Sequence, residues 1–223
     1  MTDDDVATLL AFYEAGRLQG GFESGIQFAL ERLLASPDLL LRIERDPVDA
    51  EPGTAYPVSD IELASRLSFF LWSSIPDGEL LNLAERGELR RPEVLEQQVA
   101  RMLADPRARA LVENFGGQWL RLRGIAEALP ESGLFPNYTK NLGESMRREV
   151  ELLFESVMRE DRNVLDLLST DYTFVDEVLA KHYGIPNVLG NRFQRVKLRD
   201  PNRFGLLGKA GVLTMTSLAN RTS

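Results

Sequence analysis

Residues 142–160 read LGESMRREVELLFESVMRE, and this stretch decides the fold of the chain. Its apolar residues recur at a spacing of three or four: Met146, Val150, Leu153 and Val157. At about 100° per residue these side chains lie within roughly 40° of one another on a helix. The stretch therefore predicts a long helix that buries one face against other elements.

The same helix carries the kind of carboxylates that a catalytic or di-metal site would need. Three of its acids fall opposite the apolar stripe and are expected to face solvent: Glu144, Glu151 and Glu155. Glu149 alone flanks the stripe. A di-metal carboxylate bundle needs inward-facing acids on several helices, including a Glu-x-x-His pair that the sequence does not contain. The helix therefore predicts a solvated acidic face and no metal site.

Outward from this helix, apolar residues keep helical spacing along most of the chain, while strict alternation is nearly absent. Further helices are predicted near residues 2–13, 22–34, 61–72, 92–103, 105–122, 164–168 and 175–183, with another opened by Ser36-Pro37. Ser59 and Glu62 form a capping box for one of them. The prediction is an all-α fold, a multi-helix orthogonal or antiparallel bundle, with at most a short strand near 193–198.

The positions of helix-breaking residues divide the chain into three parts. Prolines and acids between residues 46 and 57 predict a linker. It separates an N-terminal helical segment, residues 1–46, from a central helical domain, residues 56–184. Residues 185–223 are interpreted as the start of a truncated C-terminal domain, because the apolar segment 205–213 needs something to pack against.

Composition excludes several classes of site and partner. The 223 residues contain no cysteine, so disulfides, thiolate zinc, iron–sulfur clusters and an attached c-type haem are excluded. A net charge of -8 argues against nucleic acid as a partner. No stretch approaches the about 18 apolar residues of a membrane-spanning helix, so no membrane insertion is expected.

Segment 171–184 holds the densest mix of titratable and aromatic groups, including the single histidine, His182. Helical spacing places His182 on the apolar side of its helix, which favours a core or interface histidine with one hydrogen-bond partner. The alternative makes it a base or ligand supported by neighbours in the same segment. Those candidates are Asp171, Asp176 and Glu177 as acids, and Tyr172 and Tyr183 as binding residues.

Large aromatic residues elsewhere keep helical spacing and are interpreted as core: Phe69, Phe70, Trp72, Phe115 and Trp119. A ligand pocket lined by them is the alternative. The sequence has no complete phosphate-binding loop and no G-x-S-x-G elbow. The sequence therefore indicates neither a nucleotide-binding protein of the phosphate-loop type nor a hydrolase of the G-x-S-x-G type.

Four stretches together resemble a known family: residues 63–72, 114–120, 171–184 and 220–223. They are similar to domain-of-unknown-function family 1592, found in large proteins of planctomycetes and acidobacteria. The first 46 residues resemble its companion family 1595, and the stretch from Arg203 resembles the start of family 1588. The resemblance implies an exported protein, periplasmic or at the cell surface, with a cytochrome c-like domain on the same polypeptide. It implies no catalytic residue, and no cofactor in this chain, with haem in a neighbouring domain.

The sequence leaves two functional hypotheses open. The first is a non-catalytic helical scaffold or interaction module whose partners are other domains of the same polypeptide. The second is an enzyme or ligand-binding domain with a pocket around His182, completed by a missing C-terminal region. Its substrate, a small molecule or a polymer, is not indicated. The two differ in whether His182, Tyr172 and Glu177 converge on a concave site.

Overall fold

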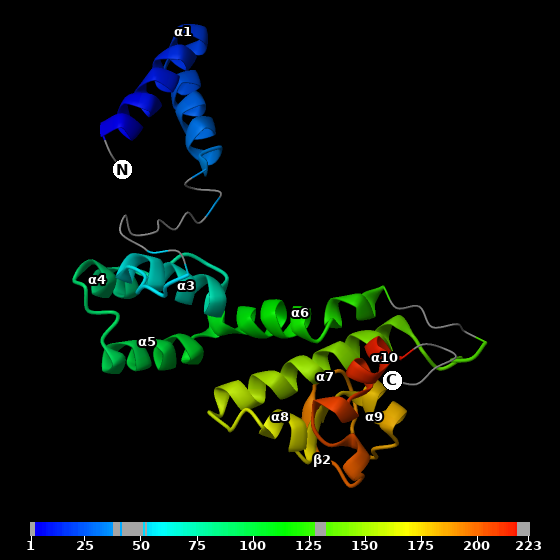
Figure 1. Cartoon of the computed structure of the whole chain (residues 1–223). Coiled ribbons are helices and arrows are strands. Elements are labelled where there is room, and N and C mark those ends of the chain that lie inside the picture. The colour runs from blue at the N-terminus through cyan, green and yellow to red at the C-terminus, as the bar shows by residue number, and fades with distance from the viewer. Residues whose placement is uncertain (1–2, 38–40, 42–50, 52, 128–132, 218–223) are drawn as a thin grey trace. The chain divides into compact units, whose positions relative to one another are not determined.

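The computed structural model describes residues 3–37, 41, 51, 53–127 and 133–217 (Figure 1). The chain divides into two compact units, residues 1–57 and 58–223. The described residues are mostly helical and include a two-stranded antiparallel sheet, which confirms the predicted fold class. Within the described residues, no helix combines the length and the apolarity that crossing a membrane requires.

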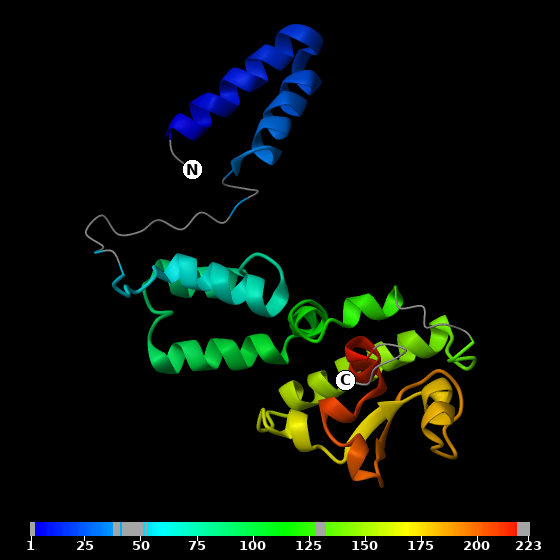
Figure 2. The same cartoon turned by 45° about the vertical axis from the view of Figure 1, so that its right-hand side comes forward.

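The first unit is a helical hairpin, α1 (Asp3–Leu34), whose two arms are visible in Figure 2. The arms separate at Gly20 and Gly21, where the predicted break occurs and where Gly21 takes a φ of 78°. The helix predicted after Ser36-Pro37 and much of the predicted linker 46–57 lie outside the described residues.

The second unit begins with three helices that share one core: α3 (Asp60–Trp72), α4 (Gly78–Glu85) and α5 (Pro92–Ala104). The predicted capping box opens α3, since the Ser59 hydroxyl accepts from the Glu62 N–H and the Glu62 carboxylate accepts from the Ser59 N–H. The core is formed by apolar side chains from all three helices: Ala64, Leu71, Leu80, Ala84 and Met102.

A helical stretch whose turns change in type joins this core to the rest of the unit. It comprises η1 (Pro106–Ala108), a π-helical turn η2 (Leu111–Gly116), α6 (Gly117–Trp119) and η3 (Leu122–Ala126). The helix predicted over 105–122 is helical from Pro106 to Trp119, but its turns change from 3₁₀ through α to π, and it ends in a turn at residues 120–121 before η3. A π-helical turn bonds residue i to i+5, so the side chains that follow it leave the 3.6-residue stripe.

The helix α7 (Lys140–Arg159) is the centre of the second core, and its predicted stripe is buried. The elements α8 (Asp166–Ser169), β1 (Tyr172–Val175), α9 (Glu177–Tyr183), β2 (Gln194–Lys197) and α10 (Ala210–Thr216) gather beside it (Figures 1 and 2). Tyr172 pairs with Lys197 and Val175 with Gln194. The strand predicted near 193–198 is confirmed, whereas its partner β1 has no predicted counterpart: only its last residue, Val175, falls in a predicted helix, 175–183, and that helix begins at Glu177 instead.

The C-terminal elements share the core of α7. Gly205 has a φ of 57°, and η4 (Pro201–Arg203) and η5 (Leu206–Gly208) lead into α10. An added Cβ at Gly211 would lie 2.8 Å from the Met146 carbonyl oxygen, so α10 approaches α7 closely. Residues 194–216 thus belong to the same compact unit as α7, and the proposed boundary at residue 185 stays a prediction.

Candidate functional site

The two tyrosines of segment 171–184 contact different groups. Tyr172 is buried, its hydroxyl lies 2.9 Å from Ser156 Oγ on α7, and it accepts a hydrogen bond from Arg162 at 3.2 Å. The Tyr183 hydroxyl donates to Glu149 Oε2 at 2.7 Å and accepts from the Ala210 N–H at 2.8 Å. They therefore belong to two separate polar contacts around α7.

The acids of the same segment form local contacts. Glu177 pairs with Lys181 at 2.6 Å and accepts from the Gly190 N–H, and the Lys181 ammonium lowers the pKa of Glu177. Asp171 lies 3.2 Å from Lys197 across the sheet. Asp176 caps α9 and accepts from Ser145 at 2.7 Å. Each acid thus has a structural partner of its own.

His182 is exposed, and its ring lies beside the Tyr183 ring at a centroid distance of 5.6 Å. The predicted burial on the apolar side of the helix is wrong, because the seven-residue α9 turns Leu179 and Ala180 into the core instead. Partial desolvation, and then the charge of Arg203, lower the pKa of His182. No hydrogen bond or ion pair joins His182 to Glu177 or Asp171 among the described residues.

Glu149 is a buried carboxylate that the sequence did not predict as a site residue. It is completely buried, and its two oxygens accept from Thr173 Oγ1 at 2.5 Å and from the Tyr183 hydroxyl at 2.7 Å. Desolvation raises its pKa to about 7, opposed by these two hydrogen bonds and by the charge of Lys209. Its position beside the apolar stripe was the available signal. Glu151, predicted to face solvent, is also buried, where it pairs with Arg147 and Arg148.

Lys209 completes this buried cluster. It is 1% exposed, and its ammonium donates to the carbonyl oxygens of Arg203 at 2.8 Å and of Tyr172 at 3.4 Å. Burial lowers its pKa to about 8. Glu149, Thr173, Tyr183 and Lys209 therefore join α7, β1, α9 and the C-terminal segment through polar contacts. Every group in the cluster is engaged by protein, which is the arrangement of a structural network.

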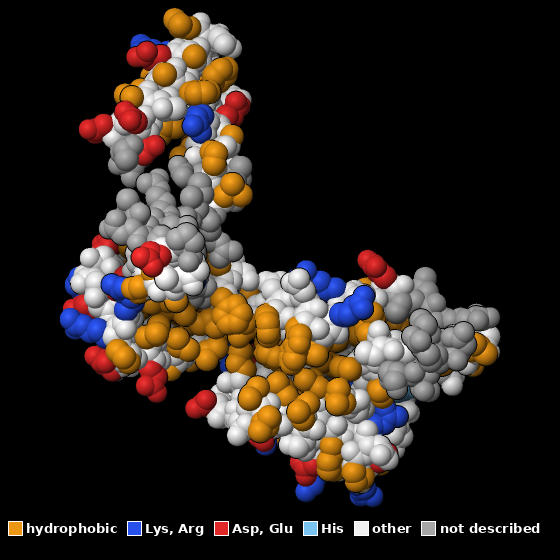
Figure 3. Space-filling view, viewed as in Figure 1, with side chains coloured by type: hydrophobic (Ala, Val, Ile, Leu, Met, Phe, Trp, Pro, Cys, Tyr) orange, Lys and Arg blue, Asp and Glu red, His pale blue; other side chains and the backbone are white. Residues whose placement is uncertain are grey.

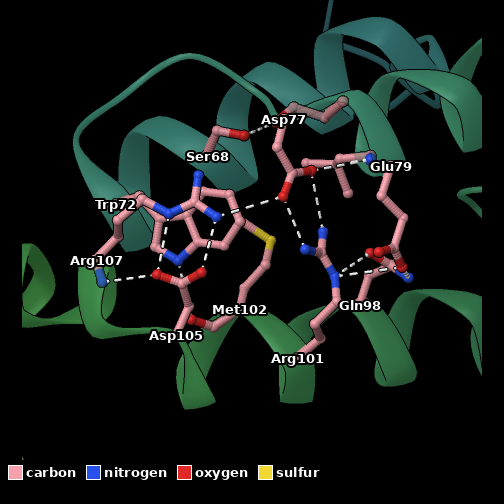
Figure 4. A network of polar contacts seen from close by, with 11 residues as sticks. Ser68, Trp72, Asp77, Glu79, Gln98, Arg101, Met102, Asp105 and Arg107 are labelled. Carbon is pink, nitrogen blue, oxygen red and sulfur yellow. Dashed lines mark hydrogen bonds and ion pairs between the residues drawn. The ribbon is translucent and has the colours of Figure 1, made fainter.

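A second polar network lies around Trp72, at the junction of α3, α4 and α5 (Figure 4). The Arg107 guanidinium lies over the Trp72 ring, 3.5 Å from its centroid, and the indole N–H donates to the Met102 carbonyl at 2.9 Å. Arg101 donates to both oxygens of Asp77 at 2.8 and 3.1 Å. Arg101 is the main cause of the lowered pKa of Asp77. Trp72 is therefore a core residue, as predicted.

Three other aromatic residues are exposed and pack on each other: Phe70, Phe115 and Trp119, which we call the aromatic face. Phe115 stacks on Trp119 at 5.9 Å and 23°, and Phe70 meets Phe115 edge-on at 5.8 Å. Their exposed fractions are 55%, 44% and 57%. Their predicted place in the core is thus wrong, because the π-helical turn and α6 hold Phe115 and Trp119 outward.

Polar groups border the aromatic face. Asn114 donates to Ser73 Oγ at 2.7 Å, and Arg123 donates to Asn114 Oδ1 at 3.0 Å. Arg121 follows with a φ of 56°, a backbone region that side-chain-bearing residues rarely take. The space-filling view shows hydrophobic side chains gathered in a broad band over this part of the second unit (Figure 3). The arrangement has the apolar centre and polar rim of a protein–protein interface.

The described part of the chain has no set of side chains that could bind a metal ion. No group of three or more His, Cys, Asp or Glu side chains there could hold a metal ion.

The second unit is a helical protein domain with a buried structural network and an exposed aromatic surface. The family model described as "Protein of unknown function (DUF1592)" matches residues 58–185, and the chain belongs to that family. Neither the curated proteins nor the solved structures gave a match.

Proposed function

We propose that the chain is a helical scaffold that binds a neighbouring domain of the same polypeptide through the aromatic face. The observation that carries this proposal is the exposed stack of Phe70, Phe115 and Trp119. Contiguous exposed apolar surface marks interaction sites in soluble proteins, and tryptophan and arginine dominate the energetic centres of interfaces. The π-helical turn beneath the stack supports it, since such turns occur frequently at functional sites.

The cellular setting is part of the same proposal. The resemblance to exported proteins with cytochrome c-like domains supports a periplasmic or cell-surface location. Haem, where present, would be held by a neighbouring domain, because this chain has no cysteine for a C-x-x-C-H attachment. The scaffold would then position such a domain without contributing a ligand of its own.

Hydroxyl-radical footprinting with mass spectrometry tests the proposal, because the chain has two tryptophans in opposite environments. Trp72 is 3% exposed and Trp119 is 57% exposed. We expect strong oxidation of Trp119 in this chain by itself, and protection of Trp119 and Phe115 in the native protein purified from its source. Trp72 is the internal control and stays unreactive in both samples.

Equal oxidation of Trp119 in the two samples would refute the proposal. A second experiment uses a Phe115→Ser, Trp119→Ser double variant of the native protein. We expect the double variant to bind the neighbouring domain less tightly. Backbone amides on the surface of that domain that contacts the aromatic face should then exchange hydrogen faster. The matched control, Leu165→Ser, changes a 65% exposed apolar residue outside the aromatic face and is expected to leave exchange unchanged.

A further inference from the structure

A groove between α4 and α5 lies apart from the aromatic face. It has a volume of about 540 Å³, within the range of small-ligand sites. Its lining comes from one side of each helix: Glu79, Asn82, Leu83 and Arg86 from α4 and its C-terminus, and Val94, Gln97 and Gln98 from α5. Leu83 and Val94 are the apolar members of this lining, and the other five residues are polar.

Gln98, one of the lining residues, is held in one orientation by the network drawn in Figure 4. It is 7% exposed, its Oε1 accepts from Arg101 Nε at 2.9 Å, and its Nε2 donates to Glu79 Oε1 at 2.8 Å. A guanidinium only donates and a carboxylate only accepts, so this network settles which way the amide points. The second N–H of the Gln98 amide has no acceptor among the described residues.

The other polar residues of the lining are two charged side chains, Glu79 and Arg86, and two side-chain amides, Asn82 and Gln97. Glu79 has a 55% exposed side chain and lies 3.4 Å from Arg101, and Arg86 has a 61% exposed side chain and pairs with Glu88 at 3.2 Å. Exposed pairs of this kind are weak, so a ligand's end charges can compete for both groups. Within the described residues, the amides of Asn82 and Gln97 form no hydrogen bond. The backbone positions of Glu79 and Arg86, seven residues apart in sequence, are about 10 Å apart along the helix axis. Three residues of extended peptide span about the same length.

We propose that the α4–α5 groove binds an extended peptide of about three residues, with its amino group at Glu79 and its carboxylate at Arg86. Side-chain amides both donate and accept, as peptide N–H and C=O groups do, so Asn82, Gln97 and Gln98 match the backbone of such a ligand. Leu83 and Val94 take its small apolar side chains. The opposite charges at the two ends fix its direction.

The experiment is an NMR titration of the whole ¹⁵N-labelled chain with trialanine, which follows the side-chain amide signals of Asn82, Gln97 and Gln98. We expect saturable shifts with a dissociation constant on the order of 1 mM, as suits a ligand of this size. Trialanine blocked by acetyl and amide groups is the ligand control. We expect it to bind several-fold more weakly, because both end charges are absent.

Two charge variants test the ends separately. Glu79→Gln still accepts from Gln98, and Arg86→Gln changes an exposed side chain, so both variants are expected to fold. Each should weaken trialanine binding by a factor of about two to five, the range for exposed charge contacts. Arg91→Gln, an equally exposed arginine outside the groove, is the matched control and should bind as the parent does.

Absence of shifts with trialanine overturns the proposal. Equal binding of blocked and free trialanine also overturns it, because the groove would then recognise amides without end charges. The groove and the aromatic face share no residue. The Phe115→Ser, Trp119→Ser variant should therefore bind trialanine normally, and failure of one proposal is distinguishable from failure of the other.

Discussion

At the scale of single residues, Glu149 gives the clearest pH-dependent prediction. Its pKa is about 7 in the folded protein and 4.5 in an ordinary setting. Between these values the unfolded chain loses the proton that the folded chain keeps, so the free energy of unfolding falls as pH rises from about 4.5 to 7. The upper limit of this loss is roughly 3 kcal/mol.

Glu149→Gln removes this titration while keeping the shape of the side chain. We expect the variant to be less sensitive to pH between 4.5 and 7 than the parent, and to gain stability relative to it at pH 7. Urea unfolding at a series of pH values measures the difference. Glu177→Gln is the control, because Glu177 pairs at the surface and its pKa is lowered. A parent-minus-variant difference that is flat across this window would contradict the prediction.

At the scale of elements, the close approach of α10 to α7 depends on Gly211. A Cβ there would lie 2.8 Å from the Met146 carbonyl oxygen and 3.3 Å from a Val150 methyl group. We expect Gly211→Ala to lower the free energy of unfolding by about 1 to 3 kcal/mol, because backbone cannot move aside cheaply. Denaturant unfolding measures this loss.

Gly117 provides the matched control for that substitution. It has helical φ and ψ, and nothing lies within 4 Å of an added Cβ. Gly117→Ala is expected to leave stability unchanged or to raise it by up to about 1 kcal/mol, through helix propensity. Equal effects of the two alanines would show that α10 does not pack on α7 in this way.

At the scale of the second unit, Arg159 joins its two helical cores. From the end of α7 it donates to the carbonyl oxygens of Leu103 at 2.6 Å and of Asp105 at 2.9 Å, where α5 ends. Arg159→Met keeps the apolar stem and removes both bonds. We expect a loss of about 1 to 3 kcal/mol in the free energy of unfolding, as for other hydrogen bonds to charged groups.

Hydrogen exchange locates the effect of this substitution. Amides near the end of α5 should exchange faster in the Arg159→Met variant, while those of β1 and β2 keep their protection. Arg109→Met is the control, since Arg109 forms an exposed pair with Glu113 and, among the described residues, no other ion pair. This variant is expected to change stability by less than about 1 kcal/mol. If both arginine variants behave alike, Arg159 does not couple the cores.

The sequence by itself determined the features that depend on neighbouring residues. Helical spacing identified the buried stripe of α7, and local chemistry identified the capping box at Ser59 and the break at Gly20 and Gly21. It also placed β2 correctly. These features follow from contacts within a few residues, which periodicity and capping rules describe.

Only the tertiary structure decided which helix faces are covered. Glu149 is buried because Thr173 and Tyr183, 24 and 34 residues away, supply hydrogen-bond donors that no local pattern encodes. Phe115 and Trp119 are exposed because a π-helical turn rotates them off the predicted stripe. Burial depends on partners that are distant in sequence, so the buried network, the aromatic face and the α4–α5 groove emerge only when the elements pack.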